Sequence, residues 1–184
     1  MKNHLTYKLT INALGIAMVA IATMFLQFPI PLGYAHLGNC FILLFAIFFG
    51  PSTGLITAGI GSALADLLTG YTLWVIPTLI IKSLMGYLIG KIASQDTNKS
   101  LKSKYVFLAS IVGIVEMIAG YTIAGAILEQ SIPAGVAQIP GLSIEGLVGI
   151  VLFYGLYGIL LNAKIKRLIH NQCHSIKLKL RRMT

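Results

Sequence analysis

Charged residues are scarce in this chain. Only 10% of its 184 residues are Asp, Glu, Lys or Arg, and the five acidic residues stand against fourteen basic ones. Soluble domains carry about 25% charged residues, so the composition excludes an ordinary soluble domain. Hydrophobic residues make up 57% of the chain, and the mean hydropathy is +0.85. The composition therefore indicates a single membrane domain over residues 1–184.

Cysteines and catalytic motifs are also scarce. Cys40 lies in an apolar run and Cys173 in a basic tail, which argues against a disulfide framework. The nearest approach to a phosphate-binding loop, "GYLIGKI" at 86–92, is one residue short between its glycines and lacks the hydroxyl. The H-E-x-x-H and G-x-S-x-G motifs are absent. We therefore expect neither an enzyme nor a cofactor. His170, Cys173 and His174 lack a fourth ligand, so no metal site is predicted.

Long apolar segments dominate the rest of the sequence. A membrane-spanning helix needs ~20 mainly apolar residues. Six segments approach that length, of which the second is short enough to be tilted or partly re-entrant. They are roughly 9–28, 37–50, 53–69, 74–93, 105–129 and 142–163. The sequence thus predicts an all-α integral membrane protein with six transmembrane helices, followed by a basic tail at 169–184.

The basic residues predict the orientation of these helices. With six spans, every Lys and Arg except Lys82 falls on one side of the membrane, in the N-terminal segment, the 91–104 loop or the C-terminal residues from Lys164 onward. The positive-inside rule therefore places both termini in the cytoplasm, and the tail with them. Because no aromatic residues are interleaved with the basic tail, nucleic acid is not expected as a partner.

This topology places the stretch "PIPLGYAHLGNCF", residues 29–41, outside the membrane between the first two spans. The other outer connections are 70–74 and 130–141. Four of the five carboxylates lie in the outer half of the membrane or near its centre, and only Asp96 is cytoplasmic. The polar chemistry is therefore expected where a molecule arriving from outside would be captured.

Small residues recur four positions apart, which puts them on one helix face. Such stripes let helix backbones approach closely in lipid. Three of them include an ionisable residue, which predicts that these charges point into the bundle. The three are Gly54-Ala58-Ser62-Asp66, Lys82-Gly86-Gly90 and Glu116-Gly120-Ala124. The stripe of Ala13 and Ala17 has no charge. It is either a docking surface for another membrane subunit or ordinary packing within the chain.

Lys82 and Glu116 are the costly residues within the predicted spans. An ionisable group there costs at least ~2.5–3.5 kcal/mol on insertion scales, so it usually faces a partner or a cavity. Lys82 lies ~12 Å below the outer end of its helix and Glu116 ~20 Å below its own, at 1.5 Å per residue. Two interpretations stay open: a structural salt bridge between them, or a contact of at least one with a ligand.

Four further residues each have a binding and a structural interpretation. His36, beside Tyr34, is interpreted as a contact to the ring or a hydroxyl of a ligand, or as a helix cap. Asn39 is a ligand contact or a helix cap. Trp74 stacks on a flat substrate or anchors the membrane interface. Glu145 is a ligand contact or a carboxylate that opens the sixth span, where it favours the helix dipole; the second interpretation is preferred.

The run "PIPLGYAHLGNCFILLFAIFFGPSTGLITAGIGSALADLLTGY", followed by "WVIPTLIIKSLMGYLIG", carries a family resemblance. It resembles the substrate-binding S component of an energy-coupling factor (ECF) transporter, over residues ~9–168 and most specifically 33–90. It is most similar to the riboflavin-type S components, a subfamily that includes pyridoxine and hydroxymethylpyrimidine carriers. The family motif reads H-[LI]-G-[DN]. This chain has Asn39 where Asp is common, which keeps a hydrogen-bonding role there but not a negative charge.

The resemblance implies a six-helix subunit with both termini inside, located in the bacterial plasma membrane. It implies a vitamin-binding pocket near the outer face, built from the first outer loop and helices 4–6, with that loop as a lid. It also implies docking of the transmembrane coupling subunit on Ala13 and Ala17, and two cytoplasmic ATPases as the energy source. We predict a substrate site formed by Tyr34, His36, Asn39, Trp74, Lys82, Glu116 and Tyr121.

Within that predicted site, Lys82 donates to a ring oxygen or nitrogen, His36 and Asn39 bind hydroxyls, and Trp74 stacks. Pyridoxine or hydroxymethylpyrimidine is the expected ligand. The alternative function is a stand-alone secondary transporter or channel for a small solute that uses Lys82 and Glu116 as a proton or ion relay.

Overall fold

The computed structural model describes residues 2–30, 33–96 and 103–160, and at 2–4, 27–35 and 160 it describes the backbone alone. In chain order its elements are α1 (Lys2–Phe25), β1 (Gln27–Ile30), β2 (Gly33–His36), α2 (Gly38–Phe49), α3 (Pro51–Thr69), the 3-10 helix η1 (Thr72–Trp74), α4 (Val75–Ala93), α5 (Lys104–Leu128), α6 (Ile132–Ala137) and α7 (Ile139–Leu160). The predicted basic tail at 169–184 lies outside the described residues.

A helix lies at each of the six predicted apolar segments: α1 to α5 and α7. Four regions have the length and hydropathy to cross a membrane: Leu5–Phe25, Thr72–Ala93, Lys104–Leu128 and Ile132–Ile159. The apolar helix α2 has 12 residues, or ~18 Å at 1.5 Å per residue, against a hydrocarbon core of about 30 Å. The chain is thus a multi-pass membrane protein in which α2 is shorter than the hydrocarbon core is thick.

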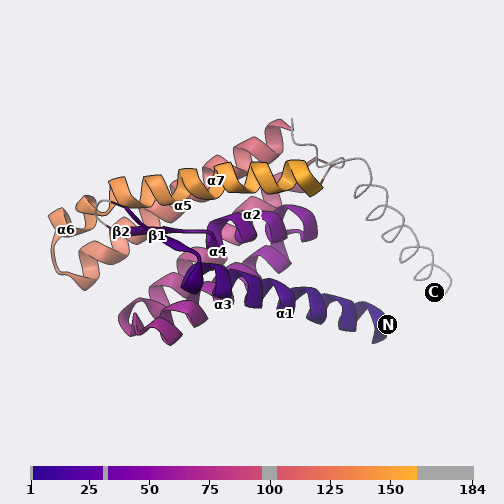
Figure 1. Ribbon diagram of the computed structural model, residues 1–184, viewed down its shortest axis with the longest axis horizontal. Helices are drawn as coiled ribbons and strands as arrows, with labels where there is room; N and C mark the ends of the chain where they lie inside the picture. The colour runs from indigo at the N-terminus through magenta and orange to yellow at the C-terminus, as the bar shows by residue number, and fades with distance from the viewer. Residues whose placement is uncertain (1, 31–32, 97–102, 161–184) are drawn as a thin grey trace.

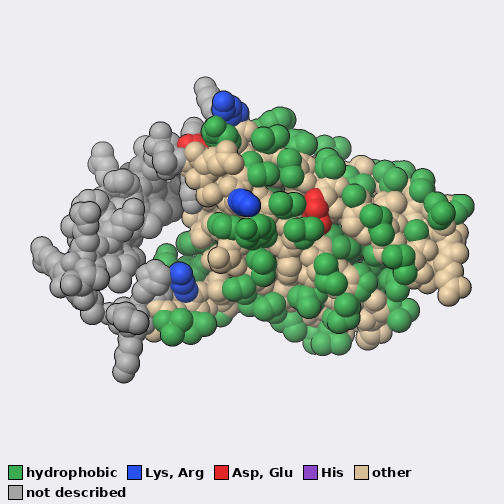
Figure 2. Space-filling view, turned by 180° about the vertical axis from the view of Figure 1, so that it is seen from behind, with side chains coloured by type: hydrophobic (Ala, Val, Ile, Leu, Met, Phe, Trp, Pro, Cys, Tyr) green, Lys and Arg blue, Asp and Glu red, His purple; other side chains and the backbone are tan. Residues whose placement is uncertain are grey.

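The surface of the bundle agrees with a lipid environment. Figure 2 shows hydrophobic side chains over most of the visible face, with the few Lys and Arg side chains toward the end at which α1 begins. Large apolar residues are exposed on the long helices, for example Ile80 on α4 and Val151 on α7. Outside a bilayer such a surface would cost free energy, because apolar area would face water.

Two of the connections predicted to lie outside the membrane contain secondary structure that was not predicted from the sequence. The stretch after α1 forms an antiparallel hairpin in which Gln27 pairs with His36 and Ile30 with Gly33. The 130–141 connection contains α6, whose cap Ser131 accepts a hydrogen bond from the Ala134 N–H at 3.4 Å. The hairpin and α6 lie at the same end of the molecule, on the left in Figure 1.

The predicted small-residue stripe holds α3 against α4. A Cβ added at Gly54 would collide with the carbonyl oxygen of Gly86, and one added at Gly86 would collide with the carbonyl of Gly54. Farther along, Gly90 lies against the backbone of Pro51. These contacts confirm that the small residues bring two backbones together, as close packing in lipid requires.

The apolar core fills the half of the bundle away from the hairpin. It combines residues of α2, α4, α5 and α7, including Leu43, Met85, Val106 and Phe153. The start of α1 and the end of α7 lie at this same end, on the right in Figure 1. The residues of the cavity lining lie in the opposite half, on the side of the hairpin.

The two faces of α1 differ in burial. Gly15 and Val19 are buried, and Gly15 packs against Thr57 and Phe45. Ala13 and Ala17 are exposed on another face of the helix. These alanines therefore do not pack within the described part of the chain.

Candidate functional site

A cavity of about 250 Å³ lies in the half of the bundle beneath the hairpin. Seven of the ten elements contribute to its walls, so tertiary packing rather than any one segment creates it. Its lining residues are Thr23, His36, Ser62, Asp66, Tyr71, Trp74, Thr78, Lys82, Tyr121, Gln138, Gly141, Leu142 and Glu145.

Lys82, Asn39 and Glu145 form a buried polar network beside the cavity. The Lys82 Nζ donates to Asn39 Oδ1 at 2.7 Å, and Asn39 Nδ2 donates to Glu145 Oε1 at 2.7 Å. Lys82 Nζ also lies 3.5 Å from Glu145 Oε1. The three residues are at most 7% exposed. Their side chains therefore compensate one another, since each would be costly to bury alone.

A glycine permits this close approach between α2 and α7. A Cβ added at Gly149 of α7 would lie 2.7 Å from the Asn39 Cβ, closer than real carbon atoms come. Since α7 has no side chain at that position, Asn39 lies close enough to reach Glu145, one turn earlier on the same helix. The network therefore depends on backbone geometry as well as on the polar residues.

His36 attaches the hairpin to this network. Its Nδ1 accepts a hydrogen bond from the Gly38 N–H at 3.2 Å, and its Nε2 lies 3.0 Å from Glu145 Oε1. With Nδ1 acting as an acceptor, the ring proton is on Nε2 and is donated to the carboxylate. His36 thus both caps the start of α2 and ties β2 to α7.

The Lys82 ammonium group is surrounded by acceptor groups of the protein. Besides Asn39 and Glu145, its Nζ contacts the Met117 sulfur at 3.0 Å. An ammonium group has three N–H donors, and three acceptors surround this one. Lys82 lines the cavity but is only 2% exposed, and its charge is compensated by Glu145.

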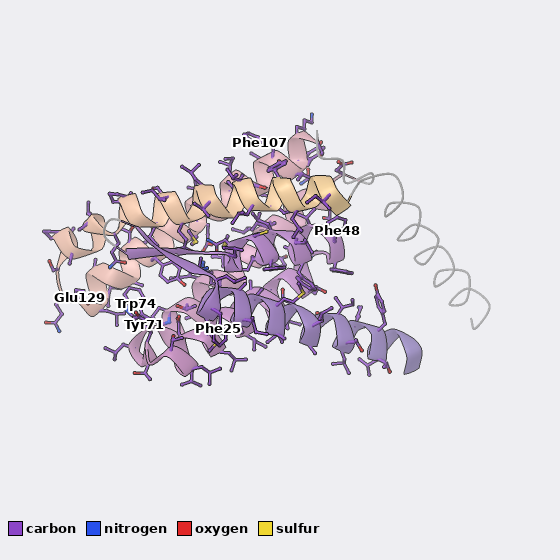
Figure 3. All side chains as sticks on the ribbon, in the orientation of Figure 1. Phe25, Phe48, Tyr71, Trp74, Phe107 and Glu129 are labelled. Atoms are coloured by element: carbon purple, nitrogen blue, oxygen red, sulfur yellow. The ribbon has the colours of Figure 1, made fainter. Side chains whose placement is uncertain are left out.

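An aromatic pair forms another part of the wall. The ring centroids of Trp74 and Tyr121 lie 5.9 Å apart at 39°. The Tyr121 hydroxyl donates to Thr78 Oγ1 at 3.0 Å, and Lys82 Nζ lies 5.4 Å from the Tyr121 ring centroid. Figure 3 shows Tyr71 and Trp74 near each other where α3 leads into α4. Flat apolar surfaces of this kind suit an aromatic ligand.

Three polar atoms of the lining have no hydrogen-bond partner among the described residues. They are Thr23 Oγ1, Ser62 Oγ and Asp66 Oδ2, and all three are buried. A buried polar group left without a partner costs ~1–3 kcal/mol. We call these three residues of α1 and α3 the open wall.

The structure brings most of the predicted site residues together. The cavity lining includes His36, Trp74, Lys82 and Tyr121. Asn39 lies behind the lining and accepts a hydrogen bond from Lys82. Asn39 is not a helix cap, since Leu37 precedes α2 and Asn39 is inside the helix.

Two other predicted residues stand apart. The side chain of Tyr34 lies outside the described residues, although its backbone pairs with Pro29 in the hairpin. Glu116 is half-buried and is not part of the cavity lining. The ion pair of Lys82 is with Glu145.

Glu145 is the residue that the sequence analysis misjudged. It was interpreted as opening the sixth span, but α7 begins at Ile139, and no acidic residue lies in its first turn. Pro140, the second residue of α7, was an available signal, because proline favours the first turn of a helix. With that start, Glu145 lies within the helix, where an ionisable residue requires a partner.

The described residues contain no group of three or more His, Cys, Asp or Glu side chains placed to hold a metal ion. The tail residues His170, Cys173 and His174 lie outside the described residues. Within the described part, the site offers hydrogen bonds, one compensated ion pair and aromatic surface. These features suit binding of a small organic molecule.

Comparisons with known proteins agree with this kind of site. The family model described as "ECF-type riboflavin transporter, S component" matches residues 3–162. A Pyrococcus woesei protein, described as an uncharacterized protein in the gap 3' region, is 34% identical over 150 residues, covering 80% of this chain and 96% of its own. A UPF0397 protein of Streptococcus agalactiae serotype Ia is 25% identical over 142 residues, covering 73% and 77%.

Proposed function

This chain belongs to the family of S components of ECF-type riboflavin transporters, and from that premise we propose that it captures a compact, ring-containing vitamin or vitamin precursor at the outer face of a bacterial plasma membrane. Membership of the family makes it a substrate-binding subunit that works with ECF coupling and ATPase subunits. The observation that carries the proposal is the cavity beneath the hairpin, where a compensated polar network meets an aromatic pair.

The size of the cavity supports a compact ligand. Its volume of about 250 Å³ lies just below the ~300–1,000 Å³ typical of ligand sites. We therefore propose pyridoxine or hydroxymethylpyrimidine, each with one ring, rather than riboflavin with its three rings and ribityl chain. Trp74 and Tyr121 contact the ring, and the hairpin, including Tyr34, covers it as a lid. His36, Asn39 and Lys82 fix the shape of the site.

Binding is measurable through the only tryptophan of the chain, Trp74, which lines the cavity. We expect pyridoxine or hydroxymethylpyrimidine to change its fluorescence saturably in the purified protein, with riboflavin binding more weakly. Equilibrium dialysis of the same samples gives the affinity independently. Trp74→Phe is the control, which removes the optical signal and keeps an aromatic ring against Tyr121.

The outcome that contradicts the proposal is the absence of saturable binding of both compact compounds to the folded wild-type protein. Tighter binding of riboflavin than of either compound would contradict the substrate choice alone. Uptake in reconstituted vesicles then distinguishes the mechanism, because an S component requires ATP and its partner subunits.

We further propose that α1 to α5 and α7 form the six transmembrane helices, with both termini in the cytoplasm. Eight of the 12 residues of α2 are buried, so neighbouring elements cover most of this helix. A short helix is tolerated at membrane depth when protein surrounds it. The exposed Lys8, Lys91 and Lys104 are near the start of α1, the end of α4 and the start of α5, which supports a cytoplasmic location of that end.

Cysteine labelling tests this topology. In a Cys173→Ser background, we expect Ser94→Cys to react with a membrane-impermeant maleimide only after the cells are opened. Ile132 is 75% exposed in the wild-type protein. The variant Ile132→Cys is therefore expected to react in intact cells. The native Cys40 is buried and supplies the unreactive background. Labelling of Ser94→Cys in intact cells would contradict the proposed orientation.

The alternative, a stand-alone transporter with a Lys82 and Glu116 relay, has less support. Lys82 pairs with Glu145 and Asn39, and Glu116 does not line the cavity. Uptake that follows a proton gradient without ATP and without partner subunits would favour that alternative.

A further inference from the structure

The polar network of His36, Lys82, Glu145 and Asn39 has its hydrogen-bonding groups paired within the protein; the first three of these residues line the cavity. Glu145 Oε1 is within hydrogen-bond distance of His36 and Asn39, and Lys82 lies 3.5 Å away. The three donors of Lys82 face Asn39, Glu145 and Met117. A ligand that took a hydrogen bond from Lys82 would have to displace one of these contacts. The network therefore supplies shape and charge balance rather than free donors.

The open wall, in contrast, has polar atoms that are not hydrogen-bonded to the described residues. Thr23 Oγ1, Ser62 Oγ and Asp66 Oδ2 are buried atoms of the cavity lining with no hydrogen-bond partner in the described part of the chain. Ser62 is only 2% exposed, and Asp66 follows it by one helical turn on the same face of α3. Buried polar groups are nearly always paired in folded proteins, so these three atoms indicate a missing partner.

The chemistry of the open wall defines what that partner must offer. An ionised carboxylate accepts hydrogen bonds and cannot donate them, while hydroxyls do either. A ligand edge that satisfies Asp66 therefore carries a donor, such as an exocyclic amino group, a ring N–H or a hydroxyl. A second donor or acceptor beside it satisfies Ser62 or Thr23. Charge-assisted hydrogen bonds to a carboxylate are also the stronger kind.

We propose that the open wall is the specificity-determining subsite of the cavity, and that the substrate is a planar heteroaromatic compound whose donor-bearing edge binds Asp66 and Ser62. The ring of the same compound contacts Trp74 and Tyr121. This inference rests on the proposed function. It assigns direct polar recognition to α1 and α3, whereas the family resemblance implies a pocket built from the first loop and helices 4–6.

Matched ligands and matched variants test the proposal together. The probes are 4-amino-5-hydroxymethyl-2-methylpyrimidine with its 4-deamino analogue, and pyridoxine with 3-deoxypyridoxine. In each pair the analogue lacks one donor on the ring. Dissociation constants are measured by equilibrium dialysis for the wild-type protein, Asp66→Asn and Ser62→Ala. The controls are Asp96→Asn and Ser143→Ala, which lie outside the cavity lining.

For the probe that binds, we expect the wild-type protein to prefer it to its analogue by roughly tenfold to a hundredfold, the range for a hydrogen bond to a charged group. Asp66→Asn removes the acceptor charge without changing the shape, so the preference should collapse. Ser62→Ala should weaken binding by roughly twofold to tenfold. Both control variants should bind as the wild type does.

Two outcomes overturn the inference in distinguishable ways. If the wild-type protein binds a probe, and the folded Asp66→Asn and Ser62→Ala variants keep its full preference over the analogue, the open wall is not the subsite and the proposed function stands. If the wild-type protein binds neither probe, the proposed function fails and the inference fails with it. Ser62→Ala provides an independent reading if Asp66→Asn reduces the yield of folded protein.

Discussion

Replacing Lys82 with methionine is expected to destabilise the folded protein by about 3–5 kcal/mol, the cost of breaking a buried ion pair from one side. Methionine retains much of the apolar stem, but Asn39 Oδ1 loses its donor at 2.7 Å. Glu145 is left with a buried carboxylate whose cationic partner has been removed. No large cavity forms, so the loss reports the electrostatic role of the ammonium group.

The reactivity of the buried Cys40 thiol measures the thermal unfolding of the Lys82→Met variant. Cys40 is free and 3% exposed, so in a Cys173→Ser background a maleimide dye reacts only as the helices separate on heating. Lys91→Met is the matched control, because Lys91 is on the same helix but exposed in its last turn. Lys82→Met with Glu145→Gln should recover most of the lost stability, since the second change removes the uncompensated charge. Unchanged unfolding of the single variant would contradict the structural role of Lys82.

Helix positions were largely predictable from the sequence, because each helix of a membrane bundle is an apolar run whose length is set by the bilayer. The small-residue stripes on α3 and α4 were predictable for the same kind of local reason. The hairpin was not anticipated, since the prolines and glycines of the 29–41 stretch indicate turns as readily as strands. The four-residue strands of the hairpin are also too short to show a clear period.

The sequence could not predict which residues pair with Lys82. Asn39 and Glu145 are separated by 106 positions in the chain, and no local pattern relates them. Glu116 and Glu145 are both single carboxylates in apolar segments, and only the packing of α7 against α2 and β2 brings Glu145 to the network. What the sequence did indicate was the need for a partner, because a charge at membrane depth is costly alone.

The open wall illustrates the same limit. The stripe that joins Ser62 to Asp66 was visible in the sequence and predicted a carboxylate facing the bundle. Whether another side chain satisfies that carboxylate depends on the surrounding helices. The structure leaves Asp66 Oδ2 and Ser62 Oγ without partners among the described residues, which converts a packing stripe into a candidate recognition surface.

Replacing Ala13 or Ala17 with tryptophan is expected to reduce ATP-dependent uptake strongly while leaving substrate binding intact. Both alanines are exposed on α1, and neither lines the cavity. We propose that they dock the coupling subunit, whose helix approaches closely only while these side chains are small. A large side chain in a close contact costs ~1–3 kcal/mol, or about five- to 150-fold in affinity for the partner.

The experiment compares vesicles that contain the wild-type protein or a variant with its coupling and ATPase subunits. Ile123→Trp is the matched control. Ile123 is 61% exposed on α5, so this substitution places a tryptophan on the surface of a different helix. Affinity for substrate is measured by equilibrium dialysis of the isolated subunit, which separates a docking defect from a binding defect. Reduced uptake in the alanine variants alone, with recovery at higher coupling-subunit concentration, supports docking at α1. Equal uptake by both alanine variants and the wild type would mean that this face of α1 contacts lipid instead.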